Sequence, residues 1–138
     1  KIAKSLAAVE YVSMGHKGLQ DTKYTKVENA EYIDQFLIRA IQEDSTYGEA
    51  YALRALAKFV LINNISDTRK IDVELAEVKE YIGIALHYDK DNILAKAEQD
   101  ELDLIVSLRD QVDHNMKYDR KALNNISDQL LDIAAEYK

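Results

Sequence analysis

Acidic side chains gather around one short polar step of the sequence, where Glu43, Asp44 and Glu49 flank a Ser-Thr-Tyr-Gly segment. Carboxyl groups at this spacing could bind calcium or act as a general acid and base. A calcium loop needs a glycine at its sixth position and a bidentate glutamate at its twelfth. Counted from Asp44, Gly48 falls at the fifth position and Ala55, which cannot ligate, at the twelfth. The residues therefore favour a corner between two helices over a metal loop.

A second acidic stretch runs from Asp89 to Asn92 and also begins like a calcium loop, but its sixth position is the apolar Leu94. We expect another helix corner here, because acids are favoured near the N-terminus of a helix. At the first corner, Thr46 and Glu49 have capping-box spacing, in which the glutamate reaches back to the threonine amide. This spacing predicts the start of a helix close to Tyr47.

Other residue types give no sign of catalysis. His16, His87 and His114 lack the Glu-x-x-His spacing of metal sites in helix bundles. The chain has no cysteine, which excludes disulfides, thiol nucleophiles and zinc–thiolate sites. It also lacks a glycine-rich phosphate loop and a Gly-x-Ser-x-Gly motif. We expect a non-enzymatic protein with no cofactor and no metal, in which each histidine has a structural role.

The net charge and the composition disfavour some classes of binding partner. A net charge of −7 with no basic stripe disfavours direct binding to nucleic acid. No apolar run approaches the length of about 18 residues that a membrane span needs. Residues 1–138 suit one domain, and a start at Lys1 without a methionine leads us to expect a fragment of a longer protein. The absence of cysteine fits the cytoplasm and the periplasm equally well.

Helical structure is expected along the whole chain, because there is no proline, only four glycines, and apolar residues recur at helical spacing. Short connections favour three antiparallel pairs of helices. The pattern predicts six helices, over about Ile2–Gly18, Thr25–Glu43, Tyr47–Ile62, Ile71–Tyr88, from after Asn92 to Val112, and Asp119–Tyr137.

Two of these helices carry specific expectations about burial. The third is apolar on nearly all sides, which predicts a position between other helices, with Arg54 and Lys58 as its only solvated stripe. The residues of the fifth helix expected to face inward are Leu94, Ala97, Leu104, Ile105 and Leu108.

An internal repeat relates two parts of the chain at an offset of 45 residues. Residues 36–44 align with residues 81–89, so that Ala40 matches Ala85 and Asp44 matches Asp89. Small residues recur where helices must approach closely and large ones where a gap must be filled, as in stacked helix-pair repeats.

The repeated segments, Ala-Ile-x-x-Asp-x-x-Tyr-x-x-Ala-Tyr and Ala-Leu-x-x-Asp-x-x-Asn-x-x-Ala, resemble the tetratricopeptide repeat over about residues 30–97. The resemblance implies an all-α, right-handed superhelix of helix pairs that binds protein. It aligns Ala40 and Ala85 with the small position of the second helix of each repeat. Ser45 and Lys90 replace the expected prolines, and the offset exceeds the usual period of about 34 residues.

The same segment, with a long insert after it, resembles the region that follows the membrane span in CadC/ToxR-like bacterial transcription activators. It also resembles the helical repeats of some regulatory ATPases. The first resemblance implies a sensing or partner-contacting part of a bacterial transcriptional regulator. It implies a periplasmic location, and without it we expect a cytoplasmic one.

Two candidate interaction sites follow from the predicted helix faces. Ala52, Leu56 and Phe59 on the third helix would line an apolar groove that suits a helix or an extended apolar segment. Glu98 and Glu101 share a face of the fifth helix and would form an acidic docking surface, unless they simply face solvent.

The function expected from these features is protein–protein interaction or sensing, with an unidentified protein partner and a homodimer as a candidate assembly. The alternative is a small-molecule sensor whose pocket lies between helix pairs. A thermal-shift screen of a ligand library that returns only buffer effects would weaken the alternative.

Overall fold

The computed structural model describes residues 6–21, 27–62, 68–110 and 120–135. The secondary structure in these ranges consists of six α-helices and the turns between them, which confirms the expected all-α class. The helices are α1 (Leu6–Asp21), α2 (Val27–Glu43), α3 (Gly48–Ile62), α4 (Thr68–Tyr88), α5 (Ile93–Asp110) and α6 (Arg120–Ala135). None of them combines the length and the apolar character that a membrane crossing requires.

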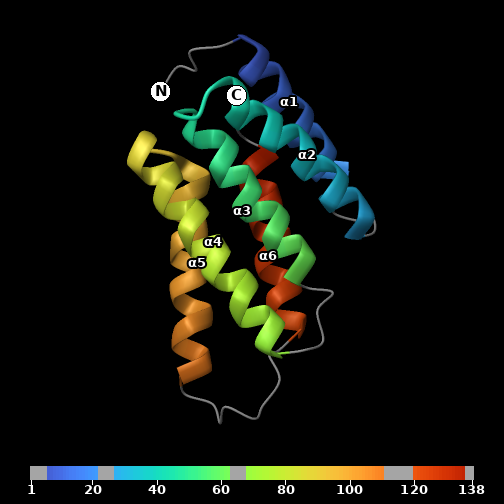
Figure 1. Cartoon of the computed structure of the whole chain (residues 1–138). Coiled ribbons are helices and arrows are strands. Elements are labelled where there is room, and N and C mark those ends of the chain that lie inside the picture. The colour runs from blue at the N-terminus through green and yellow to red at the C-terminus, as the bar shows by residue number, and fades with distance from the viewer. Residues whose placement is uncertain (1–5, 22–26, 63–67, 111–119, 136–138) are drawn as a thin grey trace.

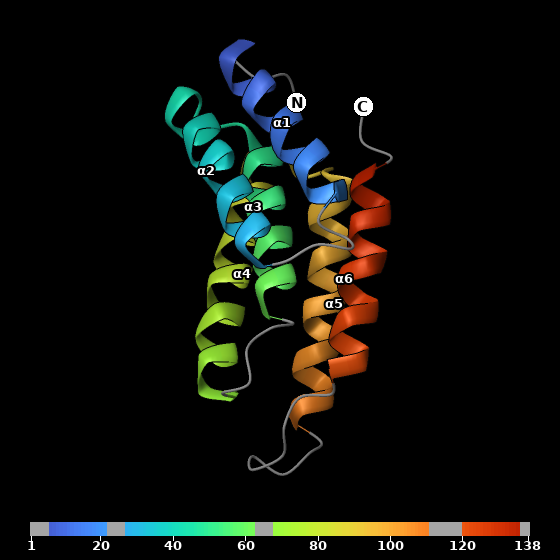
Figure 2. The same ribbon diagram turned by 90° about the vertical axis from the view of Figure 1, so that its right-hand side faces the viewer.

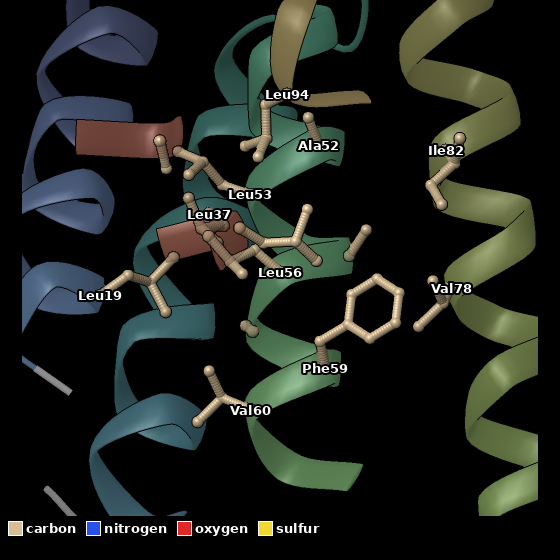
Figure 3. Packing of buried hydrophobic residues seen from close by; sticks show 14 of the residues in the cluster. Leu19, Leu37, Ala52, Leu53, Leu56, Phe59, Val60, Val78, Ile82 and Leu94 are labelled. Atoms are coloured by element: carbon tan, nitrogen blue, oxygen red, sulfur yellow. The ribbon is translucent and has the colours of Figure 1, made fainter. Parts of the chain in front are cut away.

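Helix α3 forms the centre of the molecule, in agreement with its nearly all-round apolar sequence. It contacts each of the other described helices, and Figure 1 shows it running through the middle of the bundle. Its side chains Leu53, Leu56 and Phe59 are buried, and Phe59 points toward Val78 of α4 (Figure 3). Because core burial supplies most of the stability of a helical domain, α3 is the element around which the others are held.

The remaining helices pack in chain order around α3. Consecutive helices contact one another, from α1 with α2 to α5 with α6, and α6 also contacts α1. Figure 2 shows α5 and α6 running side by side. The first and last described helices are therefore neighbours in space.

Two glycines set the close approach of α1 and α2. A Cβ atom at Gly15 would lie 2.5 Å from Leu37 Cδ2, and one at Gly18 would lie 2.7 Å from Ile33 Cδ1. Helix α1 continues to Asp21, three residues beyond the end expected at about Gly18. Gly18 gives room to α2 and does not stop the helix.

Arg54 links α3 to α2 and α4, the helices that precede and follow it in the chain. Its Nε and Nη2 atoms donate to Asp34 of α2 at 2.9 Å and 3.1 Å. Its guanidinium carbon also lies 4.6 Å from the centre of the Tyr81 ring on α4. The side chain is only 19% exposed, so the prediction of a solvated stripe is wrong at this position.

Lys58 makes a similar bridge one turn later. Its Nζ atom lies 2.9 Å from Glu74 Oε2 and 3.0 Å from Glu77 Oε2, both on α4. The two cations of α3 thus pair with carboxylates of neighbouring helices. Pairs of this kind fix which helix faces meet, because a partly buried charge needs its partner.

Candidate functional site

The two acidic corners of the sequence have the same backbone structure. Each is a tight turn that joins one helix to the next, at Asp44–Tyr47 and at Asp89–Asn92. The turns are closed by equivalent hydrogen bonds, from Asp44 N to Ala40 O and Tyr47 N to Asp44 O in the first, and from Asp89 N to Ala85 O and Asn92 N to Asp89 O in the second. The 45-residue offset of the sequence is therefore present in the backbone of the corners.

Asp44 organises the first corner. Its Oδ1 atom accepts hydrogen bonds from the Thr46 amide at 3.0 Å and from the Thr46 hydroxyl at 2.7 Å. The predicted capping box is wrong, because Asp44 takes the amide that Glu49 was expected to bind. Glu49 is left to turn inward, and it is 2% exposed.

Glu49 lies between two other helices in a buried polar chain. Its Oε2 atom is hydrogen-bonded to His16 Nε2 of α1 at 2.7 Å. Its Oε1 atom accepts a hydrogen bond of 2.7 Å from Asn92 Nδ2 at the start of α5. One carboxyl group at the first turn of α3 thus connects α1 with the second corner.

Asn92 completes this chain and caps α5. Its Oδ1 atom accepts a hydrogen bond of 2.8 Å from the Ala95 amide, which is the usual role of an N-cap asparagine. Its side-chain amide donates to Glu49 and lies 3.5 Å from Asp89 Oδ2. The start of α5 is therefore fixed to the start of α3 by side chains 43 residues apart.

Glu98 is a second buried acid on α5. Its side chain is 0% exposed, and neither carboxyl oxygen has a hydrogen-bond partner among the residues that the structure describes. Burial, and to a smaller extent the carboxyl of Glu49, raises the pKa of Glu98 well above its ordinary value. A charge without a partner is very unfavourable in an apolar interior, so Glu98 is neutral in the folded chain over a wide pH range.

The polar chain His16–Glu49–Asn92 joins side chains of α1, α3 and the corner before α5, and Glu98 lies close to it. Within the described ranges, no three His, Cys, Asp or Glu side chains gather so as to hold a metal ion. The hydrogen bonds of Glu49 are all made to groups of the chain itself. We infer that this group of residues, which we call the buried polar cluster, holds α1, α3 and α5 in one layer.

The residues of the predicted groove lie in the interior. Ala52 and Leu56 are 0% exposed and Phe59 is 1% exposed, so none of them can contact a partner at the surface. The prediction of an open groove at these positions is wrong. The expectation treated α3 as one wall of an open face, whereas other helices cover α3 on all sides.

The predicted acidic docking surface is also absent in its original form. Glu98 is buried and Glu101 is half-buried, whereas Asp100 and Asp103 are exposed. The acids of α5 thus divide between its two sides. Asp103 accepts a hydrogen bond of 2.9 Å from Gln99, so part of the exposed side is paired within the helix.

A change of face on α5 explains the position of Glu98. The large buried apolar side chains among the described residues of α5 are Leu94, Leu102 and Ile105, and Glu98 stands between the first two at four-residue spacing. Leu104, which was expected inside, is 49% exposed. The spacing alone could have revealed the buried acid, because residues four apart share a helix face.

Helix α6 covers the layer formed by α1, α3 and α5. It contacts all three of these helices, which also contact one another in the order α1, α3, α5. The buried residues of α6 are Ile126, Ser127, Leu130, Leu131 and Ala134. The Ser127 hydroxyl donates a hydrogen bond of 3.2 Å to the backbone carbonyl of Phe59. Helix α6 therefore packs the buried side of an amphipathic helix on the layer formed by α1, α3 and α5.

A shallow hollow of about 500 Å³ lies elsewhere, on the outer side of α4. Its lining residues all belong to α4, from Ala76 to Tyr88. This is not the pocket between helix pairs that a small-molecule sensor was expected to have.

Comparisons with models of protein families, with curated proteins and with solved structures find no match to this chain.

Proposed function

We propose that this chain is a non-enzymatic helical-repeat domain that binds protein. The proposed architecture is three antiparallel helix pairs in a tetratricopeptide-like, right-handed superhelix. Two observations support a repeat, namely the 45-residue offset in the sequence and the equivalent hydrogen bonds of the two corners. In repeats of this kind, neighbouring helix pairs stack into one continuous layer that can bind an extended partner.

The binding surface in this proposal is the layer formed by α1, α3 and α5. The observation that supports this binding surface is the packing of α6, an amphipathic helix whose apolar side is buried against the layer. An apolar layer that accepts one such helix has the shape and chemistry to accept another. A partner helix would therefore bind by taking the place of α6.

The contacts of α6 define the chemistry of the partner. Buried apolar residues recur at Ile126, Leu130 and Ala134, which are four residues apart and share one helix face. Ser127 adds a hydroxyl that bonds a backbone carbonyl of α3. A matching partner is an amphipathic helix with aliphatic residues at four-residue spacing and a small hydrogen-bond donor beside them.

The wider setting of the domain is also proposed. On the resemblance to CadC/ToxR-like activators, it would serve as the sensing or partner-contacting part of a bacterial transcriptional regulator. In that setting, partner binding at the α6 seat would report to a separate DNA-binding part. A full-length gene sequence that lacks any DNA-binding domain would contradict this setting without touching the binding proposal.

A peptide-exchange experiment tests the binding surface directly. A protease site inserted between Asp110 and Arg120 allows the folded chain to be cut, so that α6 is no longer covalently attached. A fluorescent peptide with the sequence of residues 120–135 is then added. We expect saturable binding seen by anisotropy, competition by the unlabelled peptide, and unchanged helical circular dichroism. A peptide with Leu130→Asp is the matched control and should not compete, because it places a charge in the apolar seat.

Failure of the wild-type peptide to exchange into a cut and still folded chain would contradict the proposal. Equal competition by the Leu130→Asp peptide would also contradict it, since binding would then not depend on the buried side of α6.

A further inference from the structure

Helix α4 has an open side directly opposite the side that it buries. Its buried residues are Ile71, Leu75, Val78, Ile82 and Ala85. Figure 2 shows α4 at the periphery of the bundle, and the hollow of about 500 Å³ lies on this helix. Ala76, Lys79, Glu80 and Gly83 line the hollow and are exposed. We call these four residues the α4 face.

Gly83 stands out among the glycines of the chain. A Cβ atom at Gly83 would meet nothing within 4 Å, whereas one at Gly15 or Gly18 would collide with a side chain of α2. Glycine inside a helix is less favourable than alanine, and no contact with the residues that the structure describes requires it at this position. Its missing side chain would instead let a second helix approach the backbone of α4 closely. Ala76, whose side chain is also small, lies two turns earlier on the same side of α4 and would allow the same close approach.

Two opposite charges lie side by side in the middle of the α4 face. On a helix, ion pairs form between residues three or four apart, and neither Lys79 nor Glu80 has an opposite charge at those distances in the sequence. Both side chains are exposed. Because Lys79 and Glu80 are adjacent, the α4 face is complementary in charge to the same face of a second copy that is rotated by 180°.

We propose that the α4 face binds the α4 face of a second copy of this chain, in antiparallel orientation. The two-fold axis passes between Lys79 and Glu80, so that each of these residues lies opposite the other in the second copy. The same axis places Ala76 opposite Gly83, which lets the helix backbones approach closely. A two-fold interface of this kind uses one patch on both copies. A parallel arrangement is disfavoured, because it would place Lys79 against Lys79 and Glu80 against Glu80.

The size of the face sets the strength of the association. Helix α4 has 21 residues, and one helix side buries less than the roughly 1,200 Å² of the smallest standard interfaces. The dimer is therefore weak and reversible, and it forms only at high concentrations of the chain. Because α6 lies on a different layer, the dimer does not depend on the binding proposal made above.

The test is sedimentation equilibrium of the whole chain at concentrations from micromolar to several hundred micromolar. The wild-type chain should show a monomer–dimer equilibrium. Lys79→Glu and Glu80→Lys should each weaken the dimer by about tenfold or more, because like charges then face each other. The double variant Lys79→Glu/Glu80→Lys should regain the wild-type constant within about threefold, because the opposite charges are restored. Lys17→Glu is the control, since Lys17 is an exposed lysine of α1.

A second variant separates association from folding. Gly83→Leu should raise the thermal midpoint of the monomer by a few degrees, because leucine is a better helix former and its Cβ meets open space. It should also abolish the dimer, because the side chain holds the two backbones apart. A wild-type chain that is monomeric at the highest concentration would overturn the proposal. So would a dimer that is unaffected by Gly83→Leu, or a double charge variant that associates no better than the single ones.

Discussion

At the scale of a single residue, Glu98 places an acidic side chain in the apolar interior. It is fully buried, it has no hydrogen-bond partner in the part of the chain that the structure describes, and Glu49 lies near enough to raise its pKa further. The ordinary value of a glutamate pKa is 4.5. Because the folded pKa is higher, the folded chain binds a proton at Glu98 more tightly than the unfolded chain does.

The first prediction is that stability falls with rising pH on account of Glu98. Its contribution is complete below pH 4.5, where both states are protonated, and is lost as the pH rises from there toward the folded pKa. The loss approaches about 1.4 kcal/mol for each pH unit in that interval. Urea unfolding followed by circular dichroism between pH 4.5 and 8 measures it, as the difference between the wild-type chain and Glu98→Gln.

Glu98→Gln keeps the shape of the side chain and cannot ionise, so its free energy of unfolding should rise relative to that of the wild type as the pH increases. Equal slopes for the two chains would show that Glu98 is not a buried neutral acid. Taking the difference removes the contribution of the other carboxylates, which both chains share.

The second prediction concerns Glu49, whose two carboxyl oxygens bond side chains of α1 and α5. Glu49→Ala should lower the free energy of unfolding by about 2–4 kcal/mol, because two buried polar partners lose their hydrogen bonds. Glu43→Ala is the matched control, since Glu43 is an exposed acid near the same corner and should change stability by less than about 0.5 kcal/mol. Equal losses in chemical denaturation would contradict the role given to the buried polar cluster.

At this scale, some features of the buried polar cluster could be predicted from the sequence and others could not. Glu98 could have been found, because it stands four residues from both Leu94 and Leu102 on the buried side of α5. The bond between His16 and Glu49 could not, because it joins side chains 33 residues apart and depends on how α1 crosses α3. Local spacing reports which helix face a residue occupies but not which distant residue meets it.

Glycine has opposite roles in two different helices at the scale of secondary-structure elements. In α1, Gly15 lies where a Cβ would be 2.5 Å from a side chain of α2, whereas in α4 a Cβ at Gly83 would meet open space. Gly15 allows two helices of the same chain to pack closely, whereas Gly83 leaves the outer side of α4 without a side chain.

The third prediction uses the same substitution at both positions. Gly15→Ala should lower the free energy of unfolding by about 1–3 kcal/mol, because Leu37 has to move from its packed position. Gly83→Ala should raise it by up to about 1 kcal/mol, since alanine favours the helix. Thermal unfolding at low micromolar concentration, where the chain is monomeric, measures both. Changes of the same sign would contradict the difference in packing.

The existence of the helices could be predicted from the chain, but their ends could not be predicted equally well. The absence of proline and the helical spacing of apolar residues predicted all six. Helix α1 ends at Asp21, three residues beyond the expected end at about Gly18, and Gly18 lies inside the helix, where it packs against Ile33. A glycine that is needed for close approach cannot be told from a terminating one without its neighbour.

At the scale of the whole molecule, α3 is the shared centre and α6 is the cover of the α1, α3 and α5 layer. The apolar sequence of α3 indicated that it lies between other helices, which the structure confirms. The position of α6 could not be predicted, because its amphipathic pattern specifies that one face is buried but not against which helices. The groove predicted at Ala52, Leu56 and Phe59 was placed on a face that the chain covers itself.

The account depends most on α6 being a cover that can leave while the rest of the chain stays folded. Native-state hydrogen exchange followed by mass spectrometry measures this directly on the intact chain, because it reports the free energy of opening for each segment. We expect amides of α6, within residues 120–135, to exchange through a partial opening at lower free energy than amides of α3. Those of α3, within residues 48–62, should exchange only on global unfolding. Identical protection of the two helices, with both exchanging only on global unfolding, would contradict the account.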